Sequence, residues 1–273
     1  MTKAKGSLAE LLRLQFKSLD DLGSNLTPRE WHASAALPGW VVFDVYAHII
    51  GTESSLEGED LPDGKLDVAS FDHVRNEIGT FNEIWIEALS SLNPQAMMDR
   101  FRSITAKRLI SLAAMTEEEF EAETSTPVGP APYWRFMQIR VFDCWMHEQD
   151  IREALGRPGH ERGPCAEAAL DEVERALGYI VGKKVGAIDG ASVTFELTGP
   201  VERILNVKVA DGRAEIVDRL RGQATTTITM TSSLFMRLIG GRTELLTGRL
   251  GEMNFSGDLD LAQKLVSNLG FTI

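Results

Sequence analysis

The segment RVFDCWMHEQDIR, residues 140–152, decides how the rest of the chain is interpreted, because it holds Asp143 and His147 four residues apart. In a helix, residues at this spacing lie on one face, so the carboxylate and the imidazole would project together. A third candidate ligand, His48, ends the upstream segment PGWVVFDVYAH, residues 38–48. Two helices bearing these residues can assemble two histidines and one carboxylate. Such a set binds a divalent metal and leaves coordination positions open for water, a thiol or substrate.

Structural explanations compete with metal binding at each of these positions. A lone histidine on an apolar helix face, such as His48, is more often a packed core residue than a ligand. An Asp-x-x-x-His pair is often only a helical side-chain interaction worth about 0.2–0.5 kcal/mol. We favour a metal site because the three residues occur together and because the sequence around them resembles a single family.

That resemblance is carried by LPGW (residues 37–40) upstream of His48 and by WMHEQDIREALGRP (residues 145–158). Both segments resemble the mycothiol-dependent maleylpyruvate isomerase family, which belongs to the DinB-like metal-binding bundles. The resemblance implies a four-helix bundle that holds zinc through His48, Asp143 and His147. It also implies mycothiol as the thiol cosubstrate and a sterol-carrier-like second domain, and it extends along nearly the whole chain.

The carboxylate position departs from the family pattern. The characterised isomerases have glutamate where this chain has Asp143. Aspartate ligates zinc as readily, but it is one methylene shorter, so the two ligand-bearing helices must approach slightly closer. The departure is compatible with metal binding and leaves open which reaction follows.

Composition is that of a globular protein of two domains. The chain has 273 residues, more than one domain usually needs, with 43% hydrophobic and 25% charged residues. A net charge of −12 gives no attraction to nucleic acid or to an anionic membrane. No apolar run approaches a membrane-spanning length, and the N-terminal residues lack a secretory apolar segment, so we expect a cytoplasmic location. Cys144 and Cys165 are the only cysteines and form no CxxC motif, which argues against a disulfide framework.

The glycine- and proline-rich segment 156–164 predicts a domain boundary, with a helical domain at residues 1–158 and a second domain at residues 159–273. In the second domain the period of the apolar pattern changes from helical to alternating, which indicates strands. The alternating segments are residues 192–198, 205–209 and 225–230. The predicted fold class is therefore α+β: a DinB-like four-helix bundle followed by a sterol-carrier-like antiparallel sheet with flanking helices.

Several details near the candidate ligands follow from the same patterns. Residues 124–132 contain three prolines and should be an irregular connection before the helix that bears Asp143. Arg140, one turn before Asp143, could meet an anionic substrate, although a surface ion pair is the expected role. Asp44 could orient His48 or simply stabilise the start of its helix. The polar residues just after His147 should form a solvated or interhelical face, and they are Glu148, Gln149, Asp150 and Arg152.

An open metal site predicts thiol chemistry. A thiol with an ordinary pKa near about 8.5 is only a few per cent thiolate at neutral pH, and coordination to zinc deprotonates it. Cys144 should lie in the core, so the protein has no suitably placed nucleophile of its own. We therefore expect a metal-dependent enzyme that uses a low-molecular-weight thiol, mycothiol by the resemblance, as an isomerase or S-transferase on a small electrophilic or unsaturated acid.

The alternative is a non-catalytic protein that binds a small molecule or lipid and keeps a vestigial metal site. The two hypotheses differ in whether the purified protein holds a stoichiometric metal. Either way the expected partners are small molecules, with neither nucleic acid nor membrane among them. The oligomeric state is left open by the sequence.

Overall fold

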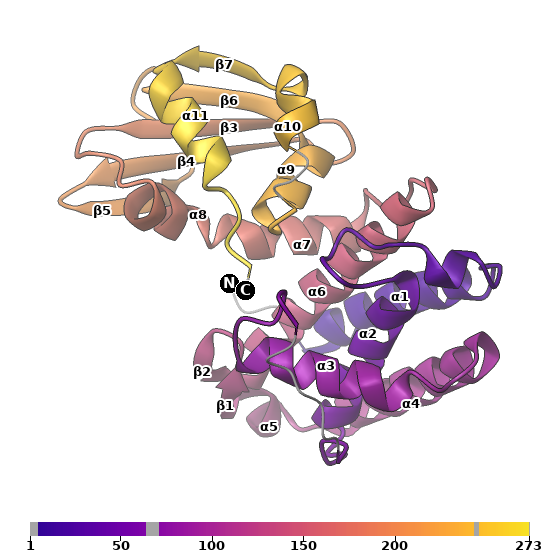
Figure 1. Ribbon diagram of the computed structural model, residues 1–273. Coiled ribbons are helices and arrows are strands. Elements are labelled where there is room, and N and C mark those ends of the chain that lie inside the picture. The colour runs from indigo at the N-terminus through magenta and orange to yellow at the C-terminus, as the bar shows by residue number, and fades with distance from the viewer. Residues whose placement is uncertain (1–4, 64–70, 243–245, 273) are drawn as a thin grey trace. The chain divides into compact units, whose positions relative to one another are not determined.

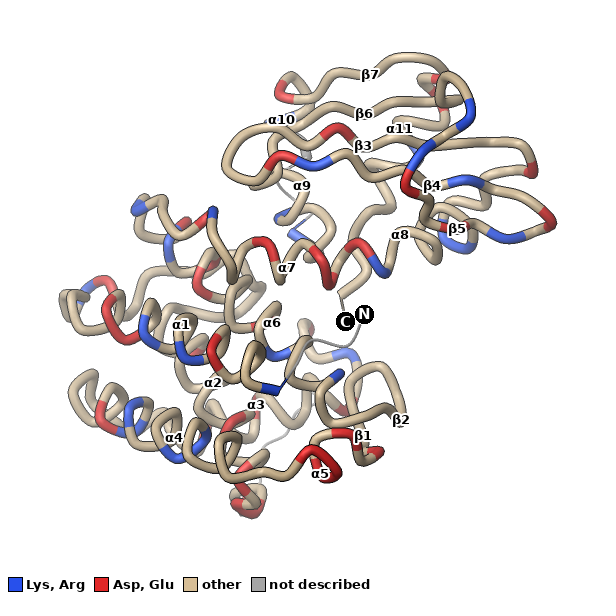
Figure 2. Tube along the Cα trace, turned by 180° about the vertical axis from the view of Figure 1, so that it is seen from behind, with Lys and Arg blue, Asp and Glu red and all other residues tan. Residues whose placement is uncertain are grey.

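The computed structural model describes residues 5–63, 71–242 and 246–272, and the chain folds as two compact units, Met1–Gly159 and His160–Ile273 (Figure 1). Acidic and basic residues are distributed along the elements of both units, with an acidic run on the short helix α5, Glu117–Glu121 (Figure 2). No helix among the described residues is long and apolar enough to cross a membrane.

The first unit is a helical bundle in which α1 packs against α4 and α6, and α2 packs against α3, α4 and α6. The long helices are α1 (Lys5–Gly23), α2 (Val42–Leu56), α3 (Glu77–Leu89), α4 (Pro94–Ala114) and α6 (Tyr133–Ala154), with the 3-10 turn η1 at Glu30–His32. The helical bundle predicted from the sequence is confirmed, and both segments that bear candidate ligands are helical.

Apolar residues at helical spacing build the core of the bundle. Leu8, Leu12 and Leu19 of α1 are at most 1% exposed, and burial of such a side chain stabilises the fold by about 1.5–3 kcal/mol. On α2, the fully buried Tyr46 packs its ring at 5.6 Å from that of Phe101 and donates its hydroxyl hydrogen to the Leu19 carbonyl. These contacts fix α2 against α1 and α4, and thereby fix the helix that carries the first histidine.

The start of α2 is set by a glycine turn and a cap. Gly39 has φ +81°, a left-handed conformation that glycine adopts without strain. Three residues later the chain enters α2, where the Asp44 carboxylate accepts the N–H of the N-cap residue Val41 at 2.8 Å. Asp44 thus satisfies a backbone donor that the helix leaves unpaired. Of the two roles considered for Asp44, the structure shows the one at the helix start.

The segment before α6 is a β-hairpin, so the prediction of an irregular connection is wrong. Strand β1 (Glu123–Thr126) pairs antiparallel with β2 (Gly129–Pro132). Antiparallel pairs alternate between hydrogen-bonded and non-hydrogen-bonded positions. The Tyr133 N–H donates to the Ala122 carbonyl, which places both prolines of β2 at the non-hydrogen-bonded positions, where a missing N–H costs nothing. The hairpin then leads directly into the first residue of α6.

The second unit combines helices with one sheet. Its strands are β3 (Ser192–Thr198), β4 (Arg203–Ala210), β5 (Arg213–Val217), β6 (Thr226–Thr231) and β7 (Asn254–Gly257). Its helical elements are α7 (Pro164–Glu174), α8 (Leu177–Tyr179), the π-helical turn η3 (Ile180–Lys184), α9 (Ser232–Ile239), α10 (Leu246–Arg249), the 3-10 turn η5 (Leu250–Glu252) and α11 (Leu259–Ser267). The α+β class predicted for this unit is confirmed.

The sheet is mixed, and the expectation of a wholly antiparallel sheet is wrong for one strand pair. The order is β5-β4-β3-β6-β7, and β3 pairs parallel with β6 while the other neighbours are antiparallel. Strand β5 runs in the same direction as β3, because each is antiparallel to β4. Residues 218–225 then cross to the other side of β3, where β6 again runs in that direction. Apolar alternation indicates which face of a strand is buried, as in Val193 and Phe195, but it does not determine the direction of its neighbour.

Candidate metal centre

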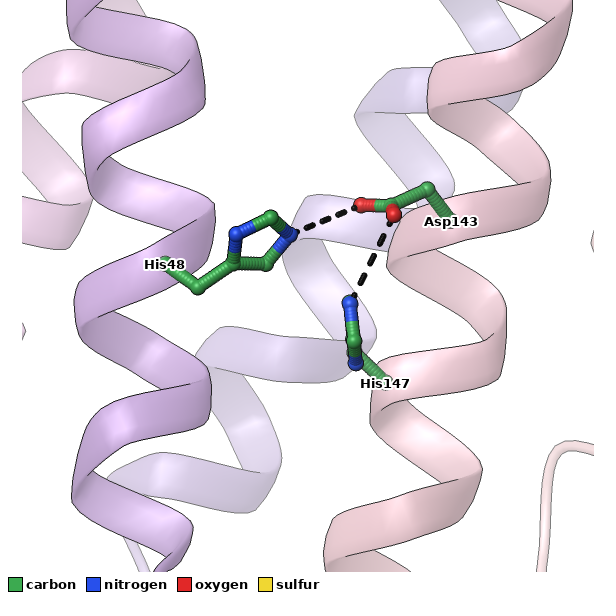
Figure 3. A group of neighbouring side chains, drawn as sticks. All are labelled: His48, Asp143 and His147. Carbon is green, nitrogen blue, oxygen red and sulfur yellow. Dashed lines mark hydrogen bonds and ion pairs between the residues drawn. The ribbon is translucent and has the colours of Figure 1, made fainter. Parts of the chain in front are cut away.

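The three predicted ligands converge, although they lie far apart in the sequence. His48 projects from α2 toward α6, which carries Asp143 and His147 (Figure 3). One ligand atom from each residue lies within 4.8 Å of the other two. The His48 Nε2 atom lies 3.4 Å from Asp143 Oδ2, and His147 Nε2 lies 3.5 Å from Asp143 Oδ1. The four-residue spacing therefore places Asp143 and His147 on the same face of α6, as expected, and α2 supplies His48 from the opposite side of the site.

The separations between these donor atoms suit a metal ion better than hydrogen bonds. A strong N–H···O hydrogen bond is about 2.7–3.2 Å long, and both histidine contacts to Asp143 are longer. Ligand atoms about 2.0–2.1 Å from a tetrahedral zinc lie about 3.3 Å from one another, and each histidine lies close to this distance from one of the two Asp143 oxygens. Two imidazole nitrogens and one carboxylate oxygen are donors that zinc and other divalent transition metals accept. The residues therefore fit the ion that the sequence implied.

The electrostatics of the site also favour a cation. Burial lowers the pKa of His48 below its ordinary value, which leaves the imidazole neutral with a lone pair to donate. Burial alone would raise the pKa of Asp143, but Arg140 and the two histidines hold it well below its usual range. Burial also opposes charge on His147, yet Asp143 and Asp150 raise the pKa of this imidazole above its ordinary value. A metal would displace a proton from His147 and meet an ionised carboxylate.

The two histidines differ in how the rest of the protein supports them. Asp150, fully buried one turn after His147, places Oδ2 at 3.1 Å from His147 Nδ1. This contact favours the tautomer that carries its proton on Nδ1 and leaves the Nε2 lone pair free to bind a metal, an arrangement common among metal-binding histidines. The Nδ1 atom of His48 is buried and makes no hydrogen bond with the described residues. Orientation of His48 therefore depends on packing.

Arg140 is a buried residue, so the expectation of a surface ion pair is wrong. It is 2% exposed and donates to Asp143 Oδ2 at 2.5 Å and to Glu53 of α2 at 2.8–2.9 Å. Glu53 also accepts from Arg108 of α4 at 2.9 Å, and Arg108 donates to Tyr133 at 2.7 Å. The spacing of Arg140 and Asp143 on one helix was visible in the sequence. The partner from α2 was not.

Among the polar residues that follow His147, Glu148 makes interhelical contacts, which is one of the two alternatives considered. Glu148 and Asp150 are fully buried. Glu148 accepts from Gln15 and Ser18 of α1, each at 2.6 Å, and from Arg152 at 2.7 Å. This face of α6 is therefore paired with α1 while the opposite face presents the ligands toward α2.

Trp40, from the LPGW turn, lies beside both histidines, and the sequence patterns alone did not identify its role. Its ring centroid is 5.4 Å from that of His48 and 6.1 Å from that of His147. The indole N–H donates to Glu83 of α3 at 2.7 Å, and the same carboxylate oxygen lies 2.8 Å from Nε2 of His73. These contacts fix the indole, and they give His73 a structural role.

Neither cysteine reaches the ligand set. Cys144 is fully buried next to Asp143 in the sequence, and Cys165 is 1% exposed in the second unit. The prediction that Cys144 belongs to the core is confirmed. Trp145 and Met146, which follow it on α6, are likewise buried.

The fold and the site together define a class of protein: a helical bundle with an internal two-histidine, one-carboxylate site, followed by an α+β unit. The family model described as "Mycothiol maleylpyruvate isomerase N-terminal domain" matches residues 12–152, and that of the C-terminal domain matches residues 167–264. The chain therefore belongs to the mycothiol maleylpyruvate isomerase family, a family of enzymes, as its sequence resemblance implied.

Solved structures agree with this assignment. The crystal structure of the mycothiol-dependent maleylpyruvate isomerase aligns with 18% identity and a TM-score of 0.58, covering 88% of this chain and 90% of that one. A histidine-to-alanine mutant of that isomerase aligns over the same shares with a TM-score of 0.56 and 18% identity. At this identity the two structures show a common fold. No curated protein matches the sequence.

Proposed function

We propose that the protein is a metal-dependent enzyme that uses mycothiol as its nucleophile, with zinc held by His48, Asp143 and His147. The observation that supports this most directly is the convergence of three donor atoms to within 4.8 Å of one another, from two helices of a bundle whose family is named for a mycothiol isomerase. Three protein ligands leave at least one position of a tetrahedral ion open, which is the arrangement of catalytic sites.

Each ligand residue has a defined part in this proposal. Neutral His48 and His147 donate nitrogen lone pairs, and Asp143 supplies the single negative charge. When bound, the metal supplies a Lewis acid that converts a thiol from a few per cent thiolate to nearly complete thiolate, a gain of roughly 2 kcal/mol in available nucleophile. Trp40 lies beside both imidazoles and limits the space in which a ligand can sit.

The thiol has to come from a small molecule because the chain has no cysteine at the site. Cys144 is 0% exposed, and neither cysteine is among the grouped ligands. An added thiolate would attack a carbon of the conjugated double bond of a small unsaturated acid. Rotation about the resulting single bond and expulsion of the same thiolate would then give the geometric isomer, with thiol and protons returned unchanged.

Transfer of the thiol to an electrophile, with loss of a leaving group, is the other reaction that the same site can support. We place isomerisation first because the family model that matches residues 12–152 is that of an isomerase. A cytoplasmic location belongs to this proposal, because the proposed reaction needs a supply of the small-molecule thiol.

Metal analysis of purified variants tests the proposed ligand set. The parent should hold about one metal per chain, and His48→Ala and His147→Ala should each lose at least 90% of it. The matched control is His32→Ala, which removes an exposed histidine from η1. All four proteins should keep the circular dichroism of the parent. Unchanged metal in both ligand variants would refute the site, and a parent purified without metal that binds none on addition would favour the non-catalytic alternative.

The thiol requirement needs a separate assay. Turnover of cis-unsaturated acids, and of electrophiles with a leaving group, should require added mycothiol. Cys144→Ala and Cys165→Ala should each keep most of the activity. Full turnover without thiol, abolished by Cys144→Ala, would make the protein's own cysteine the nucleophile and overturn the proposal.

A further inference from the structure

We propose that Arg140 is a positioning residue that fixes the orientation of the Asp143 carboxylate between His48 and His147. This inference rests on the proposed metal site and concerns how its carboxylate ligand is held. Arg140 lies three residues before Asp143 on α6, and its Nη1 atom lies 2.5 Å from Asp143 Oδ2. A hydrogen bond between two charged groups at this distance is strong and directional. It occupies one of the two carboxylate oxygens.

Arg140 is itself fixed from the opposite side. Its Nε and Nη2 atoms both contact Glu53 Oε1, at 2.9 and 2.8 Å. The second oxygen of Glu53 accepts from Arg108 Nε at 2.9 Å. The side chains of Glu53 and Arg108 are each 1% exposed and that of Arg140 is 3% exposed. Water therefore competes little for these bonds, and the guanidinium has one well-defined position.

This arrangement couples the two helices that carry the ligands. Glu53 is on α2, five residues after His48, whereas Arg140 is on α6 with Asp143. The guanidinium thus bridges α2 and α6 beside the site and sets the distance between His48 and the carboxylate. Such a bridge matters for aspartate because its short side chain brings the carboxylate close to its own helix, within reach of an arginine one turn away.

The consequence concerns the direction in which each oxygen of Asp143 faces. Oδ2, which accepts from Arg140 Nη1 at 2.5 Å, also lies 3.4 Å from His48 Nε2. The other oxygen, Oδ1, is 3.5 Å from His147 Nε2. With Oδ2 held by Arg140, the carboxylate does not rotate freely and keeps one oxygen toward each histidine. Without this bond it could turn, and the arrangement of oxygens around a bound ion would change.

A purely structural role is the competing explanation, and Arg108 provides the matched control for it. Arg108 is as buried as Arg140 and pairs with the same Glu53, but its side-chain partners among the described residues are Glu53, Glu57, Tyr133 and Met137 rather than a proposed metal ligand. Loss of either arginine leaves buried carboxylate charge without its partner and weakens the bundle. Only loss of Arg140 frees the carboxylate of Asp143.

Cobalt(II) is a suitable probe, since its visible absorption is strong at four-coordinate and weak at six-coordinate sites. Cobalt should be titrated into the full-length parent, Arg140→Gln, Arg140→Lys and Arg108→Gln, with circular dichroism as the check of folding. In Arg140→Gln we expect the absorption per bound cobalt to fall at least twofold and cobalt binding to weaken about 10- to 100-fold. Arg108→Gln should keep the parent spectrum. Arg140→Lys keeps the charge but not the fork of donors, so it should show a smaller fall.

The sign of the affinity change separates positioning from charge. Removal of a positive charge beside the site would by itself tighten cation binding, so tighter binding by Arg140→Gln would overturn the inference. An unchanged spectrum in Arg140→Gln, or an equal change in Arg108→Gln, would also overturn it. If Arg140→Gln does not fold, Arg140→Lys decides, and a parent-like spectrum there refutes the role. A parent that binds no cobalt would instead refute the proposed metal site.

Discussion

At the scale of the residue, the candidate site combines features that a sequence can show with features that it cannot. Asp143 and His147 are four residues apart, so their shared face follows from helix geometry alone. His48 could be joined to them only because its flanking residues resemble those of one family. Glu53 was unpredictable, because its contact with Arg140 depends on how α2 packs against α6. Asp150 was partly predictable, since it lies three residues after His147 on the same helix.

Asp143→Glu is the most informative single substitution, because glutamate is the residue of the family pattern. The extra methylene moves the carboxylate away from α6, so the bond to Arg140 at 2.5 Å should be lost or lengthened. We expect metal binding to survive and turnover to fall about 10- to 100-fold. Asp143→Ala should lose both. Steady-state kinetics and metal analysis of the two variants would measure this, and parent-like turnover in Asp143→Ala would show that the carboxylate is no ligand.

The pH dependence of metal affinity follows from His147. Its pKa lies above the ordinary value of 6.5, so the metal-free protein holds a proton there up to a higher pH than an ordinary imidazole does. A metal must displace this proton, and affinity should therefore fall about tenfold per pH unit below that pKa. Above the pKa, affinity should be constant with pH. A competition titration with a chromophoric chelator would measure it, and constant affinity from about pH 6 to about pH 8 would contradict the assignment of His147.

At the scale of the element, the spacing of apolar residues predicted whether most segments are helix or strand. Which strands pair, and in which direction, depends on tertiary contacts. The helix that bears Asp143 was expected, and it spans Tyr133–Ala154. The hairpin before it was missed because proline was interpreted as a breaker, although two prolines can occupy alternate positions of a strand. The parallel pairing of β6 with β3 was missed because alternation carries no information on direction.

Close packing of α2 against α3 predicts a large effect of one methyl group. A Cβ atom on Gly51 would lie 2.4 Å from the Trp85 ring, whereas one on Gly6 of α1 would meet nothing within 4 Å. Gly51→Ala should therefore lower the free energy of unfolding by about 1–3 kcal/mol through overpacking. Gly6→Ala should not lower it, since alanine favours helix more than glycine does. Chemical denaturation would measure both, and equal stability of the two variants would contradict the packing described here.

At the scale of the whole molecule, all three proposed ligands belong to the first compact unit, Met1–Gly159. A fragment that ends at Gly159 should therefore fold with helical circular dichroism and bind metal with an affinity within about tenfold of the parent. A fragment of residues 160–273 should show the mixed helix and strand spectrum of its sheet. A metal-free first fragment, with an intact helical spectrum, would mean that the second unit completes the metal site.

The α+β fold and the convergence of the candidate ligands could be predicted from the chain because local spacing and family resemblance agree at the same residues. The supporting side chains could not, since Arg108, Glu53 and Arg140 come from three different helices and meet only in the packed bundle. Trp40 was visible as part of a motif, but its position beside both histidines depends on its bond to Glu83 of α3. The positions of side chains that support the candidate ligands are thus determined by the packing of the helices, which cannot be deduced from a single sequence.

X-ray absorption fine structure at the metal edge tests the central claim most directly. On the metal-loaded parent without thiol, the account predicts only nitrogen and oxygen ligands at about 2.0–2.2 Å, supplied by His48, Asp143 and His147. After addition of mycothiol, one sulfur ligand should appear at about 2.3 Å. Absence of sulfur at saturating thiol would contradict the proposed activation of mycothiol. Sulfur already present before thiol is added would contradict the ligand set itself.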